Sequence, residues 1–221
     1  VTDSKSNLAL EGVAVTVTDK ETKKIILTTT TDKTGNFSKT LENLKYGKVQ
    51  NFEIKLEKKE YASKTLDYSN TPTQTGEINI NNQLDLSIGK VEVGVDLSKL
   101  MDIKDIYFDY GKFEIRSDAA EQLDRIVAIM NEYPLMVIEL GSHTDCRGSK
   151  NTNKTLSDNR AKASAEYIKS RITTPTRISG VGFGESKLKV NCPCEGAVVS
   201  PCPEEEHAKN RRVEFIVKKV K

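Results

Sequence analysis

Long apolar runs are missing from this chain of 221 residues. No segment approaches the roughly 18 consecutive apolar residues that favour a membrane-spanning helix. The chain starts at Val1, and no charged and then apolar leader stands before it. We therefore expect a soluble piece of a longer precursor, whose membrane anchor would lie in a region absent from this sequence.

An excess of one charge is also missing. The chain has 34 Lys and Arg residues against 32 Asp and Glu residues, for a formal net charge of +2. Non-specific binding of nucleic acid needs a concentrated excess of positive charge, and the sequence contains no such run. We expect no nucleic-acid partner.

Signatures of catalysis are missing as well. Ser142 and His143 are adjacent, and adjacent residues of a strand point to opposite faces of a sheet, which excludes a local Ser–His relay. No phosphate-cradling or metal-binding motif is recognisable. The sequence predicts a protein that is not an enzyme and that uses no cofactor.

Cysteine is scarce, and three of the four cysteines are close together, at Cys192, Cys194 and Cys202, while the fourth is Cys146. An even number in loop-rich sequence favours disulfides in an oxidising compartment, with three possible pairings. The alternative is a zinc site that uses the clustered cysteines and His207. Their spacing lacks the two cysteine pairs that are typical of zinc knuckles, so disulfides are favoured.

Residues 1–90 have the pattern of β-strands. Val13, Val15 and Val17 alternate with small or polar residues, which is the period of a half-buried strand. Turn-forming residues follow at 32–35. Further alternating segments with no helical stretch between them predict an all-β sandwich.

This half resembles the carboxypeptidase-regulatory-like family, whose β-sandwich is immunoglobulin- or prealbumin-like. The resemblance rests on LEGVAVTVTD at 10–19 and TDKTGNF at 31–37. It implies a spacer or an adhesive module and no catalytic role.

Residues 91–221 add helical patterns to strands. Leu123, Ile126, Val127 and Met130 fall on one face of a helix. Further elements are expected as a strand over 135–140, a helix over 155–171, and strands over 178–183 and 213–217. The order strand, helix, strand, helix, strand, strand predicts an α+β domain of two layers.

An acidic and a basic side chain stand on either side of the second helix start. Asp145 lies in the loop, and Arg160 shares a helix face with Leu156, Ala163 and Tyr167. We expect that face to pack on the sheet, where a guanidinium needs a partner or a ligand. The two charges could form only a structural salt bridge, or together they could bind a zwitterion.

The second half resembles the OmpA-like C-terminal domain, a periplasmic peptidoglycan-binding module with βαβαββ order. Five blocks carry the resemblance, namely YFD at 107–109, HTD at 143–145 with Gly148, NxxLSxxRA at 153–161, GFGE at 182–185 and NRRVEF at 210–215.

The resemblance implies that Asp145 and Arg160 bind diaminopimelate in the peptide stem of the Gram-negative cell wall. Asp145 would bind the ammonium group, and the planar fork of Arg160 would bind the carboxylate. A lysine-type stem lacks that carboxylate, so selectivity would follow from the missing partner. Further implied ligand-binding residues are Phe108, Asp109, Tyr110, Thr144, Asn153 and Leu156. Asn153 could equally be a helix-start residue without ligand contact.

The chain departs from the family pattern at Cys146 and in the insertion 192–202, which resembles a Bacteroidetes-type variant. The pairing preferred on this basis is Cys192–Cys202 with Cys146–Cys194. The second bridge would hold the loop that carries Asp145 in place.

Together these inferences predict a non-catalytic module that anchors an outer-membrane protein or lipoprotein to the cell wall, at the periplasmic face of the outer membrane. The alternative is a structural or adhesive module in which Asp145 and Arg160 form only a salt bridge.

Overall fold

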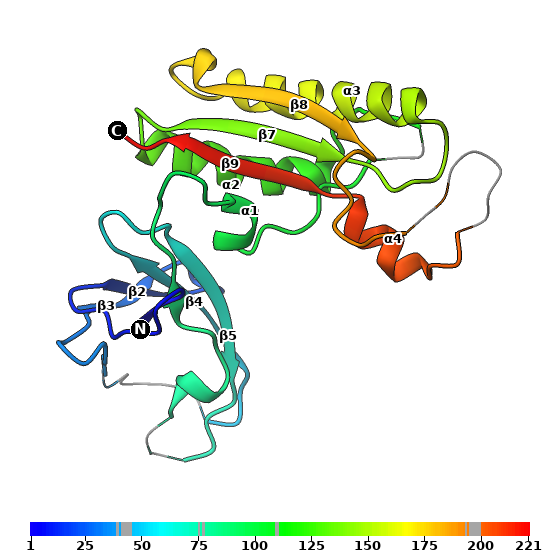
Figure 1. Cartoon of the computed structure of the whole chain (residues 1–221). Coiled ribbons are helices and arrows are strands. Elements are labelled where there is room, and N and C mark those ends of the chain that lie inside the picture. The colour runs from blue at the N-terminus through cyan, green and yellow to red at the C-terminus, as the bar shows by residue number, and fades with distance from the viewer. Residues whose placement is uncertain are drawn as a thin grey trace. The chain divides into compact units, whose positions relative to one another are not determined.

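The chain divides into two compact units, Val1–Lys90 and Val91–Lys221 (Figure 1). The structure, a computed structural model, describes residues 1–38, 40, 46–74, 76, 78–108, 111–192, 194 and 200–221. Within these residues, no helix combines the length and the apolar character needed to cross a bilayer.

The first unit is built on one antiparallel sheet with the strand order β3-β2-β4-β5. Its strands are β2 (Ala14–Asp19), β3 (Ile25–Thr30), β4 (Gln50–Glu57) and β5 (Lys64–Asn70). Two short strands, β1 (Thr2–Asp3) and β6 (Ser87–Ile88), pair in parallel.

The core of this unit lies on one face of the sheet. Val15 pairs with Leu56 and Val17 with Ile54 across the β2–β4 register, and all four are buried together with Ile88 from β6. Alternation along β2 therefore places every second side chain in the core.

The expected sandwich is not confirmed in the first unit. Outside the four-stranded sheet, the described residues contain only the two-residue β1–β6 pair. The Asn-rich stretch before β6 instead forms a short 3-10 helix, Ile80–Asn82, whose start is capped by the Asn79 side chain. Asn side chains that bond to nearby backbone favour such turns over strands.

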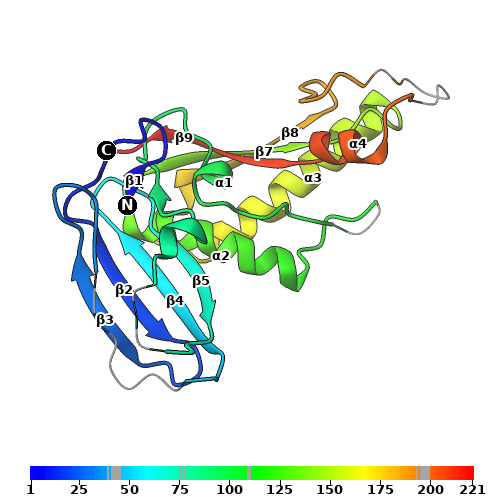
Figure 2. The same cartoon turned by 90° about the horizontal axis from the view of Figure 1, so that it is seen from below.

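The second unit places two long helices on a three-stranded sheet of order β8-β7-β9. The elements are α1 (Leu97–Leu100), α2 (Ser117–Glu132), β7 (Val137–His143), α3 (Lys150–Lys169), a 3-10 turn (Pro175–Arg177), β8 (Ile178–Gly184), α4 (Glu204–Asn210) and β9 (Val213–Lys219). β7 is central, parallel to β8 and antiparallel to β9. Both views show α3 running along β8 (Figures 1 and 2).

The amphipathic helix predicted around residue 126 is present as α2. Its side chains Leu123, Ile126 and Met130 are fully buried, as the apolar stripe requires. The residues Ile138 and Leu140 of β7 are also fully buried. This apolar layer between helix and sheet forms the core of the second unit.

The prediction of a strand before the first long helix, the first β of the βαβαββ order, was wrong. The described residues before α2 attach to the edge of β9 by a single bridge, Asp96 to Ile216. There the Gly94 N–H donates to the Val217 carbonyl at 2.8 Å. The strand stops at once because the Asp96 carboxylate accepts from Ser98 N at 3.1 Å and caps α1.

The prediction of which face of α3 packs on the sheet was also wrong. The stripe that contains Arg160 and Tyr167 is only half-buried. The buried residues of α3 are instead Asn153, Ser157, Ala161, Ser164, Ala165 and Ile168. The helix also starts at Lys150, before the predicted residue 155, because Ser149 caps it by accepting from Thr152 N at 3.1 Å.

Glycines in β8 explain why α3 buries small and polar residues. A Cβ atom at Gly182 would overlap the backbone of Ser157 and Asp158, and one at Gly180 would overlap the Ala161 carbonyl. Ser157 Oγ accepts from Gly184 N at 2.8 Å. Helix and strand backbones are therefore in direct contact, and only small side chains fit between them.

We predict that Gly182→Ala lowers the unfolding free energy of the second unit by about 1–3 kcal/mol, because the added methyl group overpacks this contact. Urea titration followed by far-ultraviolet circular dichroism reports on the second unit, which holds the long helices. Ser179→Ala, at an exposed position of the same strand, is the control and should change stability little. Equal stability of both variants would contradict the close contact.

Candidate binding site

The loop after β7 is held in place from three directions. Thr144 N donates to the Gly184 carbonyl of β8 at 3.0 Å. Asn153 Nδ2 of α3 donates to the Asp145 carbonyl at 3.2 Å. Cys146 forms a disulfide with Cys194. The loop therefore presents Asp145, whose side chain is 7% exposed, in a defined position.

The buried carboxylate of Asp145 is surrounded by guanidinium groups. Its Oδ2 accepts from Arg147 Nη2 at 2.6 Å and from Arg211 Nη1 at 2.7 Å, while Oδ1 accepts from Arg147 N at 3.0 Å. Burial by itself raises the pKa of Asp145, but the hydrogen bonds from Arg147 and Arg211 outweigh it and hold the pKa below its usual value. Asp145 is therefore ionised at neutral pH.

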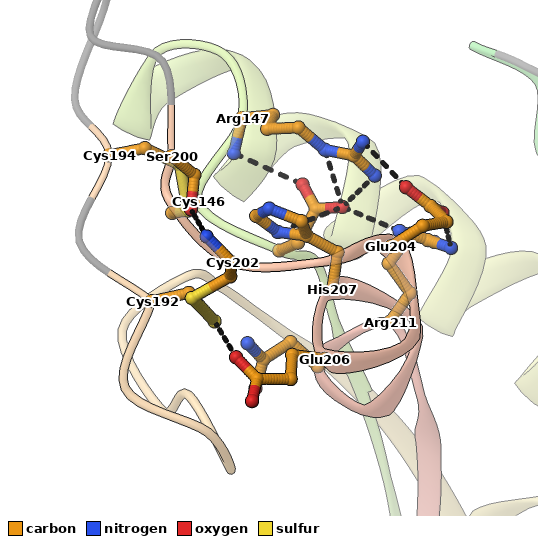
Figure 3. A network of polar contacts seen from close by, with 12 residues as sticks. Cys146, Arg147, Cys192, Cys194, Ser200, Cys202, Glu204, Glu206, His207 and Arg211 are labelled. Atoms are coloured by element: carbon orange, nitrogen blue, oxygen red, sulfur yellow. Dashed lines mark hydrogen bonds and ion pairs between the residues drawn. A yellow bond between two sulfur atoms is a disulfide. The ribbon is translucent and has the colours of Figure 1, made fainter.

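A second carboxylate closes these contacts into a ring. Glu204, the first residue of α4, accepts from Arg147 Nη1 at 2.8 Å and from Arg211 Nη2 at 2.6 Å. The four residues Asp145, Arg147, Glu204 and Arg211 form what we name the ion ring (Figure 3). Glu204 is 64% exposed, so the ring runs from a buried carboxylate to solvent.

Arg160 lies on α3 and is half-buried. Its Nε donates to the Lys112 carbonyl at 3.0 Å, and its guanidinium carbon lies 4.9 Å from the centroid of the Phe108 ring. Burial lowers the pKa of Arg160, and the positive charge of Arg211 lowers it further. Arginine keeps its charge at neutral pH all the same, so Arg160 and Arg211 are two interacting cations.

Asp145 and Arg160 are not paired with each other. Within the part of the chain that the structure describes, the ion pairs of Asp145 at or below 3 Å are with Arg147 and Arg211. The direct salt bridge of the alternative interpretation is absent from these contacts.

The other predicted ligand residues fall into three groups. Phe108 stacks on Arg160, and Leu156 is half-buried one turn before it on α3. Thr144 and Asn153 are buried beside Asp145, and Asn153 also donates to a carboxylate oxygen of Glu185. Asp109 and Tyr110 lie outside the described residues.

Sequence reasoning missed the ion ring. Arg147, Glu204 and Arg211 were not among the ligand residues predicted from the sequence. A signal existed for Arg211, which belongs to the NRRVEF block. No local pattern reveals that its partner lies 66 positions away.

The disulfides are Cys146–Cys194 and Cys192–Cys202, with Cα atoms 5.4 Å and 5.9 Å apart. This is the pairing that was preferred from the sequence, and it leaves no free thiol. His207 lies near Asp145, its Nδ1 4.0 Å from Oδ2. The zinc interpretation needed cysteine thiolates, which these bridges consume.

His143 is a structural residue at the end of β7. Its side chain is fully buried, and its ring stacks on Phe183 with centroids 5.0 Å apart. Burial, with the positive charge of Arg212, lowers the pKa of His143 to about 4. The imidazole is therefore neutral at pH 7 in the folded chain.

A comparison with known protein families matches a large part of the second unit. Residues 107–198 match the model of the OmpA family, and this region of the chain is an OmpA-family domain. The match follows the blocks around Phe108, Asp145 and Arg160.

Curated relatives match about half of this chain. Outer membrane porin F of Pseudomonas fluorescens is 30% identical over 113 residues, which are 51% of this chain and 32% of that protein. Peptidoglycan-associated lipoprotein of Agrobacterium fabrum is 27% identical over 124 residues, 56% of this chain and 67% of that protein. The matched stretch covers 13% of the length of one such relative and 70% of another.

A solved structure of peptidoglycan-associated lipoprotein from Burkholderia pseudomallei is 21% identical, with a TM-score of 0.43. The alignment covers 52% of this chain and 90% of that one.

We predict that His143 makes stability depend on pH between 6.5 and about 4, the ordinary and the lowered pKa values of His143. In this window the unfolded chain binds the proton that the folded chain excludes. Stability is therefore complete above pH 6.5 and falls with decreasing pH, by at most about 1.4 kcal/mol per pH unit.

Urea titrations across that window, on wild type and His143→Gln, measure this slope. The variant should lose the His143 part of it. Asp145 does not interfere, because its lowered pKa removes stability only at more acidic pH. An unchanged slope in the variant would assign the pH dependence to other groups.

Proposed function

We propose that the second unit binds the peptide stem of peptidoglycan through the amino-acid head of diaminopimelate, and so anchors an outer-membrane protein or lipoprotein to the cell wall. One observation carries the proposal. Arg211 donates to the ionised Asp145 at 2.7 Å and its positive charge acts on Arg160, while the described ion pairs of Asp145 at or below 3 Å are with Arg147 and Arg211. The OmpA-family match and a relative named peptidoglycan-associated lipoprotein support it.

Asp145 has acceptor capacity for an ammonium group. Its Oδ1 accepts one hydrogen bond among the described residues, from Arg147 N, whereas Oδ2 accepts from two guanidinium groups. A carboxylate oxygen has two lone pairs, so Oδ1 can accept a further, charge-assisted hydrogen bond. The pairing of Oδ2 keeps the carboxylate charged until the ligand arrives.

Arg160 provides the complementary half. Its planar guanidinium matches a carboxylate in a two-point arrangement that an ammonium cannot copy. Phe108 lies against it and supplies an apolar wall. A stem with lysine in place of diaminopimelate lacks the distal carboxylate. If such a stem were bound, the lysine ammonium would lie near the Arg160 guanidinium, with no carboxylate between the two positive charges.

The remaining site residues have supporting roles in this proposal. Thr144 and Asn153 position the Asp145 loop, as their bonds to Gly184 and to the Asp145 carbonyl indicate. Leu156 shapes the side of the site next to Arg160. Asp109 and Tyr110 stay proposed ligand contacts outside the described residues.

The setting that we propose is the periplasmic face of the outer membrane, with no catalysis. Two disulfides agree with an oxidising compartment. The first unit would act as a spacer of the carboxypeptidase-regulatory-like kind. The alternative, an adhesive module with a structural Asp145–Arg160 salt bridge, is less well supported, because that pair is absent from the described contacts of Asp145.

We predict that a stem tetrapeptide with diaminopimelate at its third position binds the whole chain, with an affinity around micromolar or weaker, as expected for a small charged head. Asp145→Asn and Arg160→Gln should each weaken binding at least about tenfold, which corresponds to 1.4 kcal/mol. Isothermal titration calorimetry measures both effects.

Two controls sharpen this titration. The matching tetrapeptide with lysine at the third position should bind much more weakly. Arg171→Gln removes an exposed guanidinium that stacks on Tyr167 near the end of α3, and it should bind like wild type. The proposal fails if folded wild type binds neither the tetrapeptide nor a whole muropeptide, or if both site variants bind normally.

A further inference from the structure

Strand β3 forms one edge of the four-stranded sheet in the first unit (Figure 2). Within the described residues it pairs on one side only, with β2. Its sequence, IILTTT, contains neither a charged residue nor a proline, and Ile25 at its start is 65% exposed. An edge of this composition favours pairing with a further strand.

The opposite edge of the same sheet, β5, is protected. Its sequence includes Lys64 and Asp67, and Lys64 forms an ion pair with Asp85 at 2.7 Å. Directly before β5, Ala62 N donates to the Gly89 carbonyl at 2.9 Å, so another segment of the unit covers the start of this edge. Charges and covering segments are common ways of blocking edge pairing, and they distinguish β5 from β3.

The backbone of β3 directs its unused groups to the open edge at Thr28 and Thr30. Thr31, directly after the strand, donates its N–H to the Val13 carbonyl at 3.0 Å. In an antiparallel strand the N–H and C=O of one residue point to the same side, and the side alternates from residue to residue. The odd-numbered residues 27 and 29 therefore bond toward β2, and Thr28 and Thr30 point away from it.

The side chains of β3 alternate between the two faces of the sheet. Leu27 and Thr29 lie opposite core residues of β2, so their side chains share the core face. Thr28 is exposed on the outer face. A strand that joins at this edge must place its own core-facing residues opposite Leu27 and Thr29, because a slip of one residue reverses every side chain.

A second copy of β3 meets both requirements when it runs antiparallel with Thr28 opposite Thr28. The backbone groups of both Thr28 residues point to the open edge, so the two residues can exchange hydrogen bonds. Leu27 of each copy then lies opposite Thr29 of the other, which joins core face to core face. The contact has two-fold symmetry, as a closed dimer requires.

Charges at the ends of β3 also favour the antiparallel direction. Lys24 and Asp32 are both exposed and stand four residues before and four residues after Thr28. The register centred on Thr28 therefore brings Lys24 of each copy to Asp32 of the other, and opposite charges across a strand pair are stabilising. A parallel pairing would instead place Lys24 beside Lys24. Lys23 and Lys33 lie one residue further out, where solvent screens them.

We propose that β3 is a self-association surface, through which two copies of this chain pair as antiparallel strands centred on Thr28 and form one continuous sheet. The inference concerns the first unit and does not depend on the function proposed for the second. One short strand from each copy is a small contact, so the expected dissociation constant is about 10 µM to 1 mM. Two copies of the second unit in one particle would bind a polymeric ligand with higher avidity than one.

Sedimentation equilibrium of the whole chain, from about 5 µM to about 1 mM, tests the proposal. The weight-average mass of wild type should rise from that of one copy toward that of two. Thr28→Lys should raise the dissociation constant at least about tenfold, because it places two like charges directly opposite each other in the dimer.

Thr65→Lys is the matched control. Thr65 is exposed on β5 and lies in the same row of the sheet as Thr28, through Thr16 of β2 and Lys55 of β4. The same charge added at this edge should leave self-association at the wild-type level.

An equimolar mixture of Thr28→Lys and Thr28→Glu tests the register. Each variant alone should stay close to the mass of one copy, whereas the mixture should associate at least as strongly as wild type, because opposite charges then face each other. Circular dichroism verifies that each variant is folded. Thr30→Lys with Thr30→Glu, at the next residue that points to the open edge, gives the same like-charge test if the Thr28 variants do not fold.

The other outcomes overturn the inference. A wild type that keeps the mass of one copy up to 1 mM would show that β3 does not self-associate in this range. Association that Thr28→Lys leaves unchanged would assign it to another surface, and an equal loss in Thr65→Lys would assign it to the outer face of the sheet. A mixture that fails to restore association would exclude the register centred on Thr28.

Discussion

The second unit depends on burying one carboxylate and keeping it charged. Removing an isolated carboxylate from water costs several kcal/mol, unless counter-charges and hydrogen bonds replace the solvent. Asp145 obtains one counter-charge from Arg147, two positions along the chain, and the other from Arg211, 66 positions away. The fold must therefore bring two distant segments to one point, and the sheet does so.

Strand pairing provides that meeting point. β7 and β9 are antiparallel, and Ser142, near the end of β7, lies opposite Val213, at the start of β9. Asp145 and Arg211 each lie a few residues beyond this pair, on the same end of the sheet. On the other side, the close contact of α3 with the glycines of β8 determines where Arg160 stands relative to the loop. The backbone geometry thus determines where the charged residues Asp145, Arg160 and Arg211 lie.

The resulting site differs from a simple clamp of one acid and one base. Its acid is already held by two guanidinium groups, and Glu204 joins those groups at the surface. A ligand ammonium group would add to this arrangement at Oδ1 rather than replace a partner at Oδ2. The site is therefore preorganised, and the ligand need not order a mobile carboxylate.

Much of the second unit could be predicted from sequence, because its signals are local. The apolar stripe of α2 and the alternation of β9 each follow from a period within one element. Through resemblance, the two sequence blocks around Asp145 and Arg160 predicted that both residues belong to one site. The family of the domain followed from the same blocks, and the match over 107–198 confirms it.

The failures came from contacts between elements. A periodic pattern of apolar residues reveals the buried face of a helix only when that face is apolar. Helix α3 instead buries Ser157 and Ala161, because the glycines in β8 leave no room for larger residues. The first strand was wrong because one side chain, Asp96, both bonds to β9 and starts α1. The ion ring was missed because nothing near Arg211 in the sequence points to Asp145.

The connectivity of the two disulfides has a consequence for how the chain matures. Read along the sequence, the bridges interleave, since Cys192 lies inside the loop closed by Cys146 and Cys194 and bonds outside it to Cys202. If the chain were oxidised as it emerges, from its N-terminus onward, Cys146 would join Cys192 first, because Cys192 is the next thiol to appear. That bond is not native, and it leaves Cys194 to pair with Cys202. From that intermediate, the folded arrangement is reached only by a thiol–disulfide exchange.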